Sequence, residues 1–184
     1  MKLKVSNVNY PNWRPVTVKF NAPKEFEKLQ EISKNLWWVW NYEVVDLFKE
    51  MNDQLWKEVG GNPVVFLQKL RSEEYKELAK NESFMKKMDK VYANFRAYMD
   101  VKPSQSVPSI AYFSMEYGLT DILKIYSGGL GVLAGDYLKE ASDCNVDMTA
   151  VGFLYRYGYF TQSLSMNGEQ VALYEAQVFD TLPI

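Results

Sequence analysis

The chain has no histidine and only one cysteine among its 184 residues. Histidine is the commonest general base and the commonest metal ligand, so its absence removes both roles at once. A single cysteine, Cys144, cannot form a disulfide within the chain and cannot build a zinc site or a cysteine–histidine nucleophile. Any chemistry must therefore use carboxylates, tyrosines, backbone amides or a borrowed cofactor, and no metal site is expected.

An excess of one charge and a long apolar run are also missing. Lysine and arginine number 21 against 23 aspartates and glutamates, and no basic run stands out, which argues against a nucleic-acid partner. No stretch is as long and apolar as a membrane span requires, and the first twenty residues lack the apolar segment of a signal peptide. Together with the scarcity of cysteine, these absences favour a cytoplasmic protein without a membrane partner.

Helical periodicity dominates residues 22–100. After a lead-in over residues 1–20 that is expected to be extended, apolar side chains recur at steps of three and four. A glycine-rich break over 60–63 separates two of the expected helices. Three polar residues are predicted to cap helices at their N-termini: Asn41, Ser72 and Asn81.

Three tryptophans lie close together at positions 37, 38 and 40. Their indole faces could stack on sugar rings, but the neighbouring apolar residues share their helical face, and large aromatic side chains dominate core burial. We therefore predict that Trp37 and Trp40 are buried in the core. Trp38 lies off the main apolar stripe, so contact with a sugar ring remains an open interpretation for this residue.

The pattern changes after residues 103–108, where two prolines indicate a linker. This boundary predicts a mostly helical domain over 1–102 and a different domain over 109–184. The second domain begins with an apolar run of strand length, 109–115.

Strand, helix and strand follow one another in this second domain. A helix is expected to start near Gly129 or Leu130 and to end near Cys144, and a second apolar run covers 148–155. Such a unit implies a parallel sheet that binds ligands at the carboxyl ends of its strands. Residues 155–176 are predicted to form a β-hairpin that turns at Asn167 and Gly168.

Three glycines, Gly128, Gly129 and Gly131, lie at the start of the predicted helix. A backbone without Cβ atoms can turn sharply and approach a ligand closely, and a helix N-terminus offers free amides to an anion. A phosphate cradle and a tight turn that serves packing only are both open interpretations. The spacing Gly129-x-Gly131-x-x-Ala134 also has the form of a dinucleotide-binding fingerprint, but residues 116–128 separate it from the apolar run.

Three sequence blocks together resemble one enzyme family. They are Ala-Tyr-Phe-Ser-Met-Glu-Tyr-Gly-Leu (111–119), Tyr-Ser-Gly-Gly-Leu-Gly-Val-Leu-Ala-Gly-Asp (126–136) and Gly-Phe-Leu-Tyr-Arg-Tyr-Gly-Tyr-Phe-Thr-Gln (152–162). In this order and spacing they resemble the amino-terminal part of the α-glucan (glycogen, starch or maltodextrin) phosphorylases. The tryptophan-rich segment 35–41 is similar to the leading domain of the bacterial and archaeal branch. The resemblance implies an α/β fold in which a leading helical domain precedes the start of a Rossmann-like GT-B domain with an incomplete parallel sheet.

The resemblance also implies a reaction and its partners. The family are retaining glycosyltransferases that phosphorolyse terminal α-1,4-linked glucosyl units to glucose 1-phosphate. Pyridoxal 5'-phosphate is the cofactor, and its own phosphate exchanges a proton with inorganic phosphate. The cofactor lysine belongs to a second Rossmann domain, so we expect no catalytic residue and no activity in these 184 residues alone. Assembly into a homo-oligomer stays open.

Site residues follow from the resemblance position by position. The loop that faces the phosphates and the glucosyl unit matches Gly128, Gly129, Leu130 and Gly131. Gly129 is expected to have a positive φ or to leave no room for a Cβ beside a phosphate. Glu116 matches a glutamate that is interpreted as orienting this loop through its amides, with a solvated carboxylate as the alternative. The scaffold of the cleft matches Tyr155, Tyr157 and Gln162.

Two other functions remain as alternatives. Glycogen and starch synthases share the GT-B fold, but they place a lysine two residues before the glycine pair, where this chain has Tyr126. A non-catalytic module that binds glucan is the second alternative.

Overall fold

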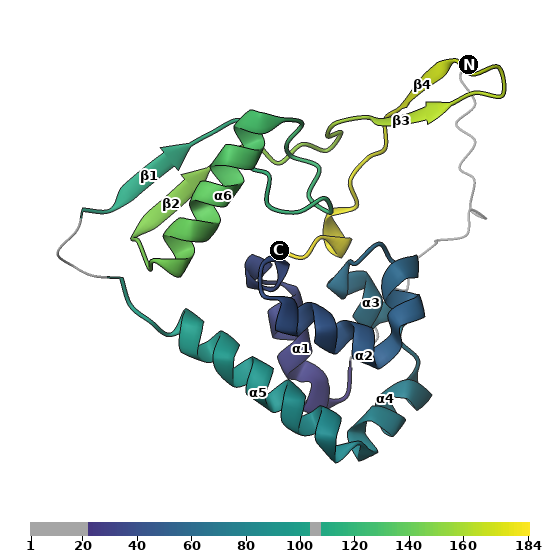
Figure 1. The fold of residues 1–184 in the computed structure, drawn as a ribbon, viewed down its shortest axis with the longest axis vertical. Coiled ribbons are helices and arrows are strands. Elements are labelled where there is room, and N and C mark those ends of the chain that lie inside the picture. The colour runs from purple at the N-terminus through teal and green to yellow at the C-terminus, as the bar shows by residue number, and fades with distance from the viewer. Residues whose placement is uncertain (1–21, 104–107) are drawn as a thin grey trace, which may run out of the picture.

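A computed structural model describes residues 22–103 and 108–184, and it combines many helices with two small sheets (Figure 1). The predicted extended lead-in over 1–20 and most of the predicted linker over 103–108 lie outside the described residues. The helices of residues 24–99 form one half of the molecule. Residues 108–184 form the other half and return to the helical half at their carboxyl end (Figure 1). These two groups are called the helical half and the α/β half below.

The first half is mostly helical, as the periodicity predicts, and contains seven helices in the described range. They are η1 (Lys24–Phe26), α1 (Glu27–Ser33), η2 (Leu36–Val39), α2 (Tyr42–Glu58), α3 (Pro63–Lys69), α4 (Ser72–Lys80) and α5 (Glu82–Met99). The helices enclose one core because each of them presents apolar side chains on one side. Phe48 lies at its centre, stacked on Trp56 at 5.1 Å between ring centroids and edge-on to Phe66 at 5.4 Å.

Of the predicted N-caps, Asn81 is confirmed, Asn41 is confirmed in position but not in its side-chain bond, and Ser72 is wrong. Asn81 caps α5 by accepting a hydrogen bond from the amide of Phe84 (3.1 Å). Asn41 does occupy the N-cap position of α2, but its side chain donates to the carbonyl of Trp37 instead. Ser72 is already the first residue of α4, whose N-cap is Arg71. There the carboxylate of Glu74 accepts a hydrogen bond from the Arg71 amide (2.9 Å).

The predicted burial is confirmed for Trp37 and wrong for Trp40, and the structure settles Trp38, which the sequence left open, as a core residue. Trp37 and Trp38 are both buried in the core, whereas Trp40 is only partly buried against it. The cause is a break in the expected helix: α1 ends at Ser33, and Asn35 caps the separate 3₁₀-helix η2 by accepting from the Trp37 amide. A new helix with three residues per turn changes the phase of the stripe, so Trp38 points inward.

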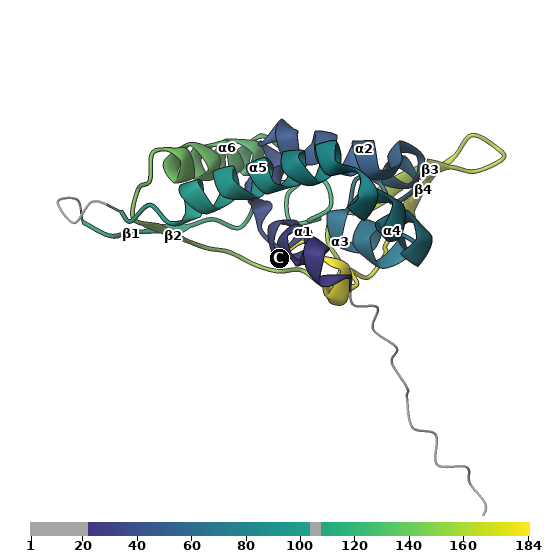
Figure 2. The same ribbon diagram turned by 90° about the horizontal axis from the view of Figure 1, so that it is seen from below.

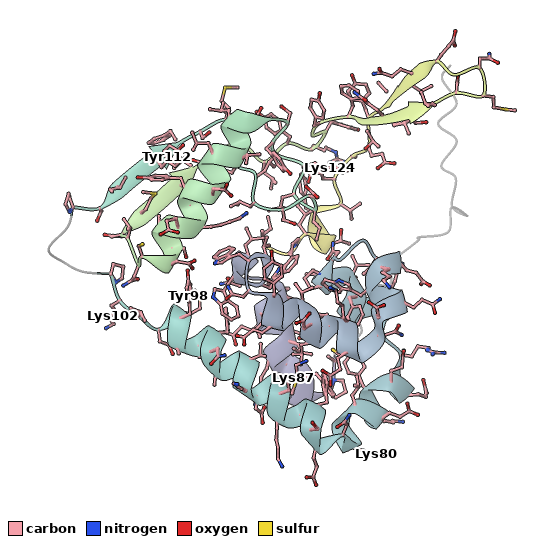
Figure 3. The ribbon with its side chains drawn as sticks, viewed as in Figure 1. Lys80, Lys87, Tyr98, Lys102, Tyr112 and Lys124 are labelled. Atoms are coloured by element: carbon pink, nitrogen blue, oxygen red, sulfur yellow. The ribbon has the colours of Figure 1, made fainter. Side chains whose placement is uncertain are left out.

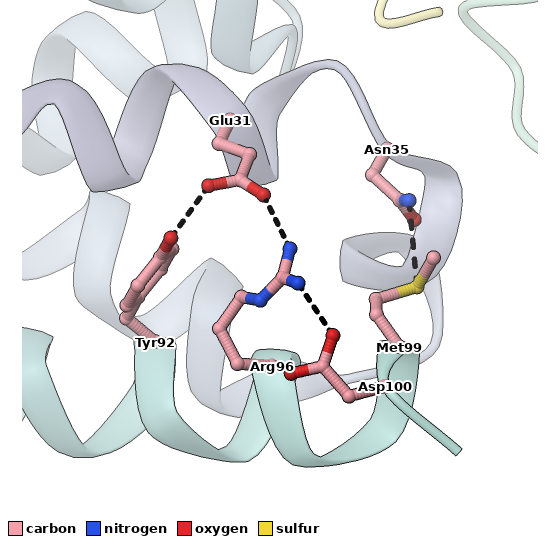
Figure 4. A network of polar contacts seen from close by, with 6 residues as sticks. All are labelled: Glu31, Asn35, Tyr92, Arg96, Met99 and Asp100. Carbon is pink, nitrogen blue, oxygen red and sulfur yellow. Dashed lines mark hydrogen bonds and ion pairs between the residues drawn. The ribbon is translucent and has the colours of Figure 1, made fainter. Parts of the chain in front are cut away.

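A polar network on the surface links α1 to α5 (Figure 4). Glu31 on α1 accepts from the hydroxyl of Tyr92 (2.6 Å) and from Arg96 (2.8 Å), and Arg96 also pairs with Asp100 at 2.5 Å. The hydrogen bond to Glu31 is the main cause that raises the pKa of Tyr92. Exposed ion pairs contribute little stability, so the buried core and not this network holds α1 against α5.

The α/β half contains the predicted strand–helix–strand unit. Strand β1 (Ile110–Phe113), helix α6 (Gly129–Asp143) and strand β2 (Met148–Val151) follow each other, and the strands pair in parallel with Ile110 opposite Met148. Both strands are shorter than the apolar runs that predict them. Helix α6 lies against one face of the pair (Figure 2).

The predicted hairpin is also present. Strands β3 (Thr161–Leu164) and β4 (Gln170–Leu173) pair antiparallel. Gly168 has a φ of +79°, which glycine adopts without strain, and its amide donates to the carbonyl of Ser165 to close the turn. After the hairpin, η3 (Phe179–Thr181) returns to the helical half, where Asn62 donates to the Thr181 carbonyl at 2.9 Å.

Candidate functional site

The glycine loop lies where the chain enters α6, at the carboxyl edge of β1. Gly128 is the N-cap of α6 and has extended backbone angles (φ −159°, ψ −160°). The first three helical residues are therefore Gly129, Leu130 and Gly131, whose amides have no partner inside the helix. Their dipoles add to give the helix N-terminus a partial positive charge.

Glu116 lies against this helix end. Its Oε2 accepts from the Ser127 amide (3.1 Å) and its Oε1 from the Ser127 hydroxyl (3.1 Å). The hydrogen bond from the Ser127 amide is the main cause that lowers the pKa of Glu116, and the amides of Gly128 and Gly131 act in the same direction. The carboxylate is thus held in its charged form and already neutralises part of the helix end.

The loop crosses a second glycine-containing segment at very short range. The amide of Gly118 donates to the carbonyl of Gly131 at 2.7 Å. A Cβ on Gly131 would come within 2.5 Å of the Cβ of Tyr126, and one on Gly135 would come within 2.3 Å of the Gly118 carbonyl oxygen. Only glycine fits at these two helix positions, because real Cβ atoms do not approach so closely. Sequence reasoning missed Gly118 and Gly135, although the spacing Gly131-x-x-x-Gly135 places two small residues on one helix face.

Gly128 and Gly129 differ from these packing glycines. A Cβ at either position would meet nothing within 4 Å, and neither residue has a positive φ. The expectation of a positive φ at Gly129 is therefore wrong, because the residue already belongs to the regular first turn of α6. Among the hydrogen bonds of the described residues, none uses the amides of Gly129 or Leu130. The amides of Gly129 and Leu130 are thus free at the helix N-terminus, and the space beside Gly129 is open.

Tyr117 anchors the segment before the loop to the two strands. The sequence analysis did not single out this residue. Its ring is buried, and its hydroxyl is 2.6 Å from the carbonyl of Tyr112 on β1 and 3.1 Å from that of Val151 on β2. Burial raises the pKa of Tyr117. Gly152 makes room for the ring, since a Cβ there would lie 2.7 Å from it. The ends of both strands therefore fix the turn that carries Glu116.

An open pocket of about 220 Å³ adjoins the loop. Glu116 and Ser127 line one side, and Tyr155 and Tyr157 line another. Lys124, labelled in Figure 3, also reaches this pocket, and its ammonium group is 3.5 Å from the carboxylate of Glu175. The structure therefore brings two predicted cleft residues close to Glu116 and Ser127, whereas the predicted loop residues 128–131 are not among the pocket-lining residues.

Gln162 does not join them. It lies on β3 opposite Ala172 and is not among the pocket-lining side chains. Within residues 22–103 and 108–184, no group of three or more aspartate, glutamate, cysteine or histidine side chains could hold a metal ion. The same part of the chain contains no helix that is long and apolar enough to cross a membrane.

Comparison with known proteins gives relatives that span almost the whole chain. It is 38% identical to a glycogen phosphorylase of Mycobacterium tuberculosis over 93% of its length, and 36% identical to a maltodextrin phosphorylase of Thermococcus litoralis over 91%. A glycogen phosphorylase of Aquifex aeolicus is 38% identical over 86% of the chain. The chain spans only about a fifth of the length of these relatives (21%, 21% and 23%).

No solved structure matches the chain. Residues 22–123 match the family described as "Protein of unknown function (DUF3417)". This match includes all helices of the helical half and continues through Glu116 and Tyr117. Because it covers more than half of the residues, the chain belongs to the DUF3417 family.

Proposed function

We propose that this chain is part of an α-glucan phosphorylase, which transfers a terminal α-1,4-linked glucosyl unit to inorganic phosphate and forms glucose 1-phosphate. The observation that carries the proposal is the meeting of three sequence blocks at one helix end. Glu116, Ser127 directly before the glycine loop, and the tyrosines of segment 152–162 come from three separate blocks but line one pocket. The names of the relatives support the same reaction.

The loop would act through its amides and not through a titrating side chain. Glu116 engages Ser127, so the free amides of Gly129 and Leu130 remain for an oxygen of a phosphate group. Preorganised amides stabilise negative charge without reorganising during the reaction. The open space over Gly129 supports this role, because it lets a ligand approach the backbone closely.

The described residues fit the phosphate of pyridoxal 5'-phosphate but not its aldehyde. The two free amides suit a phosphate oxygen, whereas Lys124, the lysine among the residues that line this pocket, forms an ion pair with Glu175 (3.5 Å). We assign the cofactor lysine to the part of the relatives that this chain does not match. When bound, the cofactor would supply a phosphate that exchanges a proton with the substrate phosphate.

The same proposal assigns the domains. Residues 1–102 form a leading helical domain, 103–108 a linker, and 109–184 the first part of a Rossmann-like GT-B domain. The α-glucan, inorganic phosphate and glucose 1-phosphate are the partners, and the cytoplasm is the compartment. A synthase reaction has less support, because Tyr126 stands where synthases place a lysine and hydrogen-bonds to Asp121 (2.7 Å).

A chimeric enzyme tests the proposal. The chain replaces the segment that it matches in the glycogen phosphorylase of Mycobacterium tuberculosis, and release of glucose 1-phosphate from glycogen and phosphate is measured. We expect activity within about tenfold of the parent enzyme, with cofactor absorbance and melting temperature as controls for loading and folding. A folded, cofactor-loaded chimera that binds glucan but does not phosphorolyse it would contradict the proposal and favour the binding module.

A further inference from the structure

Helix α6 connects the glycine loop to the helical half. The loop amides lie at its N-terminus, and its last residue is Asp143. At 1.5 Å per residue, a helix of 15 residues is about 22 Å long. A regular helix of this length is stiff, so a contact that fixes one end also restricts where the other end lies.

Asp143 is the residue of α6 that accepts hydrogen bonds from two residues of the helical half. Its Oδ1 accepts from the indole Nε1 of Trp40 (3.0 Å) and from the hydroxyl of Tyr98 on α5 (2.7 Å). The Tyr98 oxygen is also 2.7 Å from the hydroxyl of Ser142. Figure 3 shows Tyr98 at the end of α5 that faces α6. Just beyond, Asn145 donates to the carbonyl of Lys102 at 2.7 Å.

The two donors are themselves held by the core of the helical half. The ring of Tyr98 is 5.8 Å from that of Trp37, and Trp40 packs partly buried against the same core. The contact therefore joins α6 to two residues that pack against the core of the helical half.

The negative charge of Asp143 does not stabilise α6 by itself. A carboxylate at a helix C-terminus faces the negative end of the helix dipole, which disfavours it. The last turn of α6 contains no basic residue to compensate. The favourable interactions of Asp143 come instead from the two donors in the helical half, so its place in the structure is explained by the junction.

We propose that the helical half positions the glycine loop, and that Asp143 is the positioning residue through which it does so. Trp40 and Tyr98 hold the carboxyl end of α6, and the helix transmits this constraint to Gly129 and Leu130 at the other end. The proposal assigns a physical role to the helical half, which lies within the DUF3417 match. The inference rests on the proposed function only in its consequence for catalysis.

Amide hydrogen exchange in the chain itself tests this inference. The reporters are three hydrogen-bonded amides around the loop: Ser127 to Glu116, Gly118 to Gly131 and Val132 to Gly128. Asp143→Ala removes the acceptor and Tyr98→Phe removes one donor. We expect each variant to speed exchange at the reporters at least tenfold and to leave the amides of Phe84 and Val91 in α5 unchanged. Asp136→Ala removes a charge from the same helix without touching the junction and should change neither set.

Three results would overturn the inference. Unchanged exchange at the reporters would mean that the junction does not constrain the loop. Equal acceleration at the reporters and in α5 would show a general loss of stability. Acceleration in Asp143→Ala but not in Tyr98→Phe would show that the hydrogen bond from Tyr98 does not restrain the loop. Because none of these readouts uses phosphorolysis, an inactive chimera would leave the result intact and would count against the proposed function alone.

Discussion

At the scale of single residues, the glycines near the loop divide by the space around them. Gly131 is enclosed by Tyr126 and Glu116, whereas Gly129 borders open space. Composition and spacing revealed the cluster but not this division, because both kinds of glycine stand in one short sequence. The space beside Gly131 depends on Tyr126 and Glu116, which come close to it only in the folded chain.

Alanine at these two positions should have opposite effects on stability. Gly131→Ala forces its Cβ against Tyr126, and overpacking of this kind costs roughly 1–3 kcal/mol. Gly129→Ala needs no rearrangement and restricts the unfolded chain, so it should be neutral or stabilise by about 0.4–1 kcal/mol. Urea unfolding of both variants measures the difference. Equal losses of stability would show that the two sites are not distinct.

The loop should loosen in acid through Glu116. Its pKa is lowered in the folded chain, chiefly by the Ser127 amide, so its stabilising effect is present above the ordinary glutamate pKa. That effect disappears as the pH falls through the lowered folded pKa. We expect carbon NMR titration of the Glu116 carboxyl to give a value below that of an unstructured glutamate, and Ser127 exchange to accelerate over the same range after correction for intrinsic rates. Glu116→Gln should remove the pH dependence of Ser127 exchange. A Glu116 carboxyl that titrates at the ordinary glutamate pKa would contradict this prediction.

At the scale of elements, sequence patterns identified helices better than their boundaries. The periodicity over 22–100, the βαβ unit and the Gly168 turn are all present. The break at Ser33–Leu36 was missed because Phe26, Leu29, Ile32 and Leu36 continue an α-helical pattern across it. Both helix types place residues three apart on the same side, so a short 3₁₀-helix leaves no distinct pattern.

Capping residues give a test at this scale. Asn81→Ala removes the acceptor of the Phe84 amide and should destabilise the chain by about 1 kcal/mol. Ser72→Ala alters a residue that is already inside α4 and should be within about 0.5 kcal/mol of the parent. Thermal unfolding followed by far-ultraviolet circular dichroism compares them. A larger loss of stability in Ser72→Ala than in Asn81→Ala would show that Ser72 is a helix cap after all.

At the scale of the whole molecule, the contacts between the two halves left no sequence signal. Trp40 and Asp143 are 103 positions apart, and Asn62 and Thr181 are 119 apart. No local pattern relates such pairs, and each residue has an unremarkable neighbourhood. The main helices and strands of each half could therefore be predicted from local patterns, whereas the contacts between the halves needed the structure.

The junction should weaken in alkali. Burial, with the neighbouring carboxylate of Asp143, raises the pKa of Tyr98 to about 12. A raised folded pKa means that the stabilising effect is complete below the unfolded value of about 10 and is lost as the pH rises towards 12. Tyrosinate absorbance, compared between the parent and Tyr98→Phe, should show one tyrosine that ionises late. If the difference spectrum titrates near pH 10, Tyr98 is not held at the junction.

The central claim is that the amides of Gly129 and Leu130 receive a phosphate group, and Gly129→Asp in the chimeric phosphorylase tests it most directly. An aspartate at a helix N-terminus favours the helix, and the space around Gly129 is open, so the melting temperature should stay the same or rise. The added carboxylate would compete for the two amides, whose contacts are worth ~1–2 kcal/mol each. We predict a fall in kcat/KM for phosphate on the order of a hundredfold. Turnover at the parental rate by the folded, cofactor-loaded variant would contradict the claim.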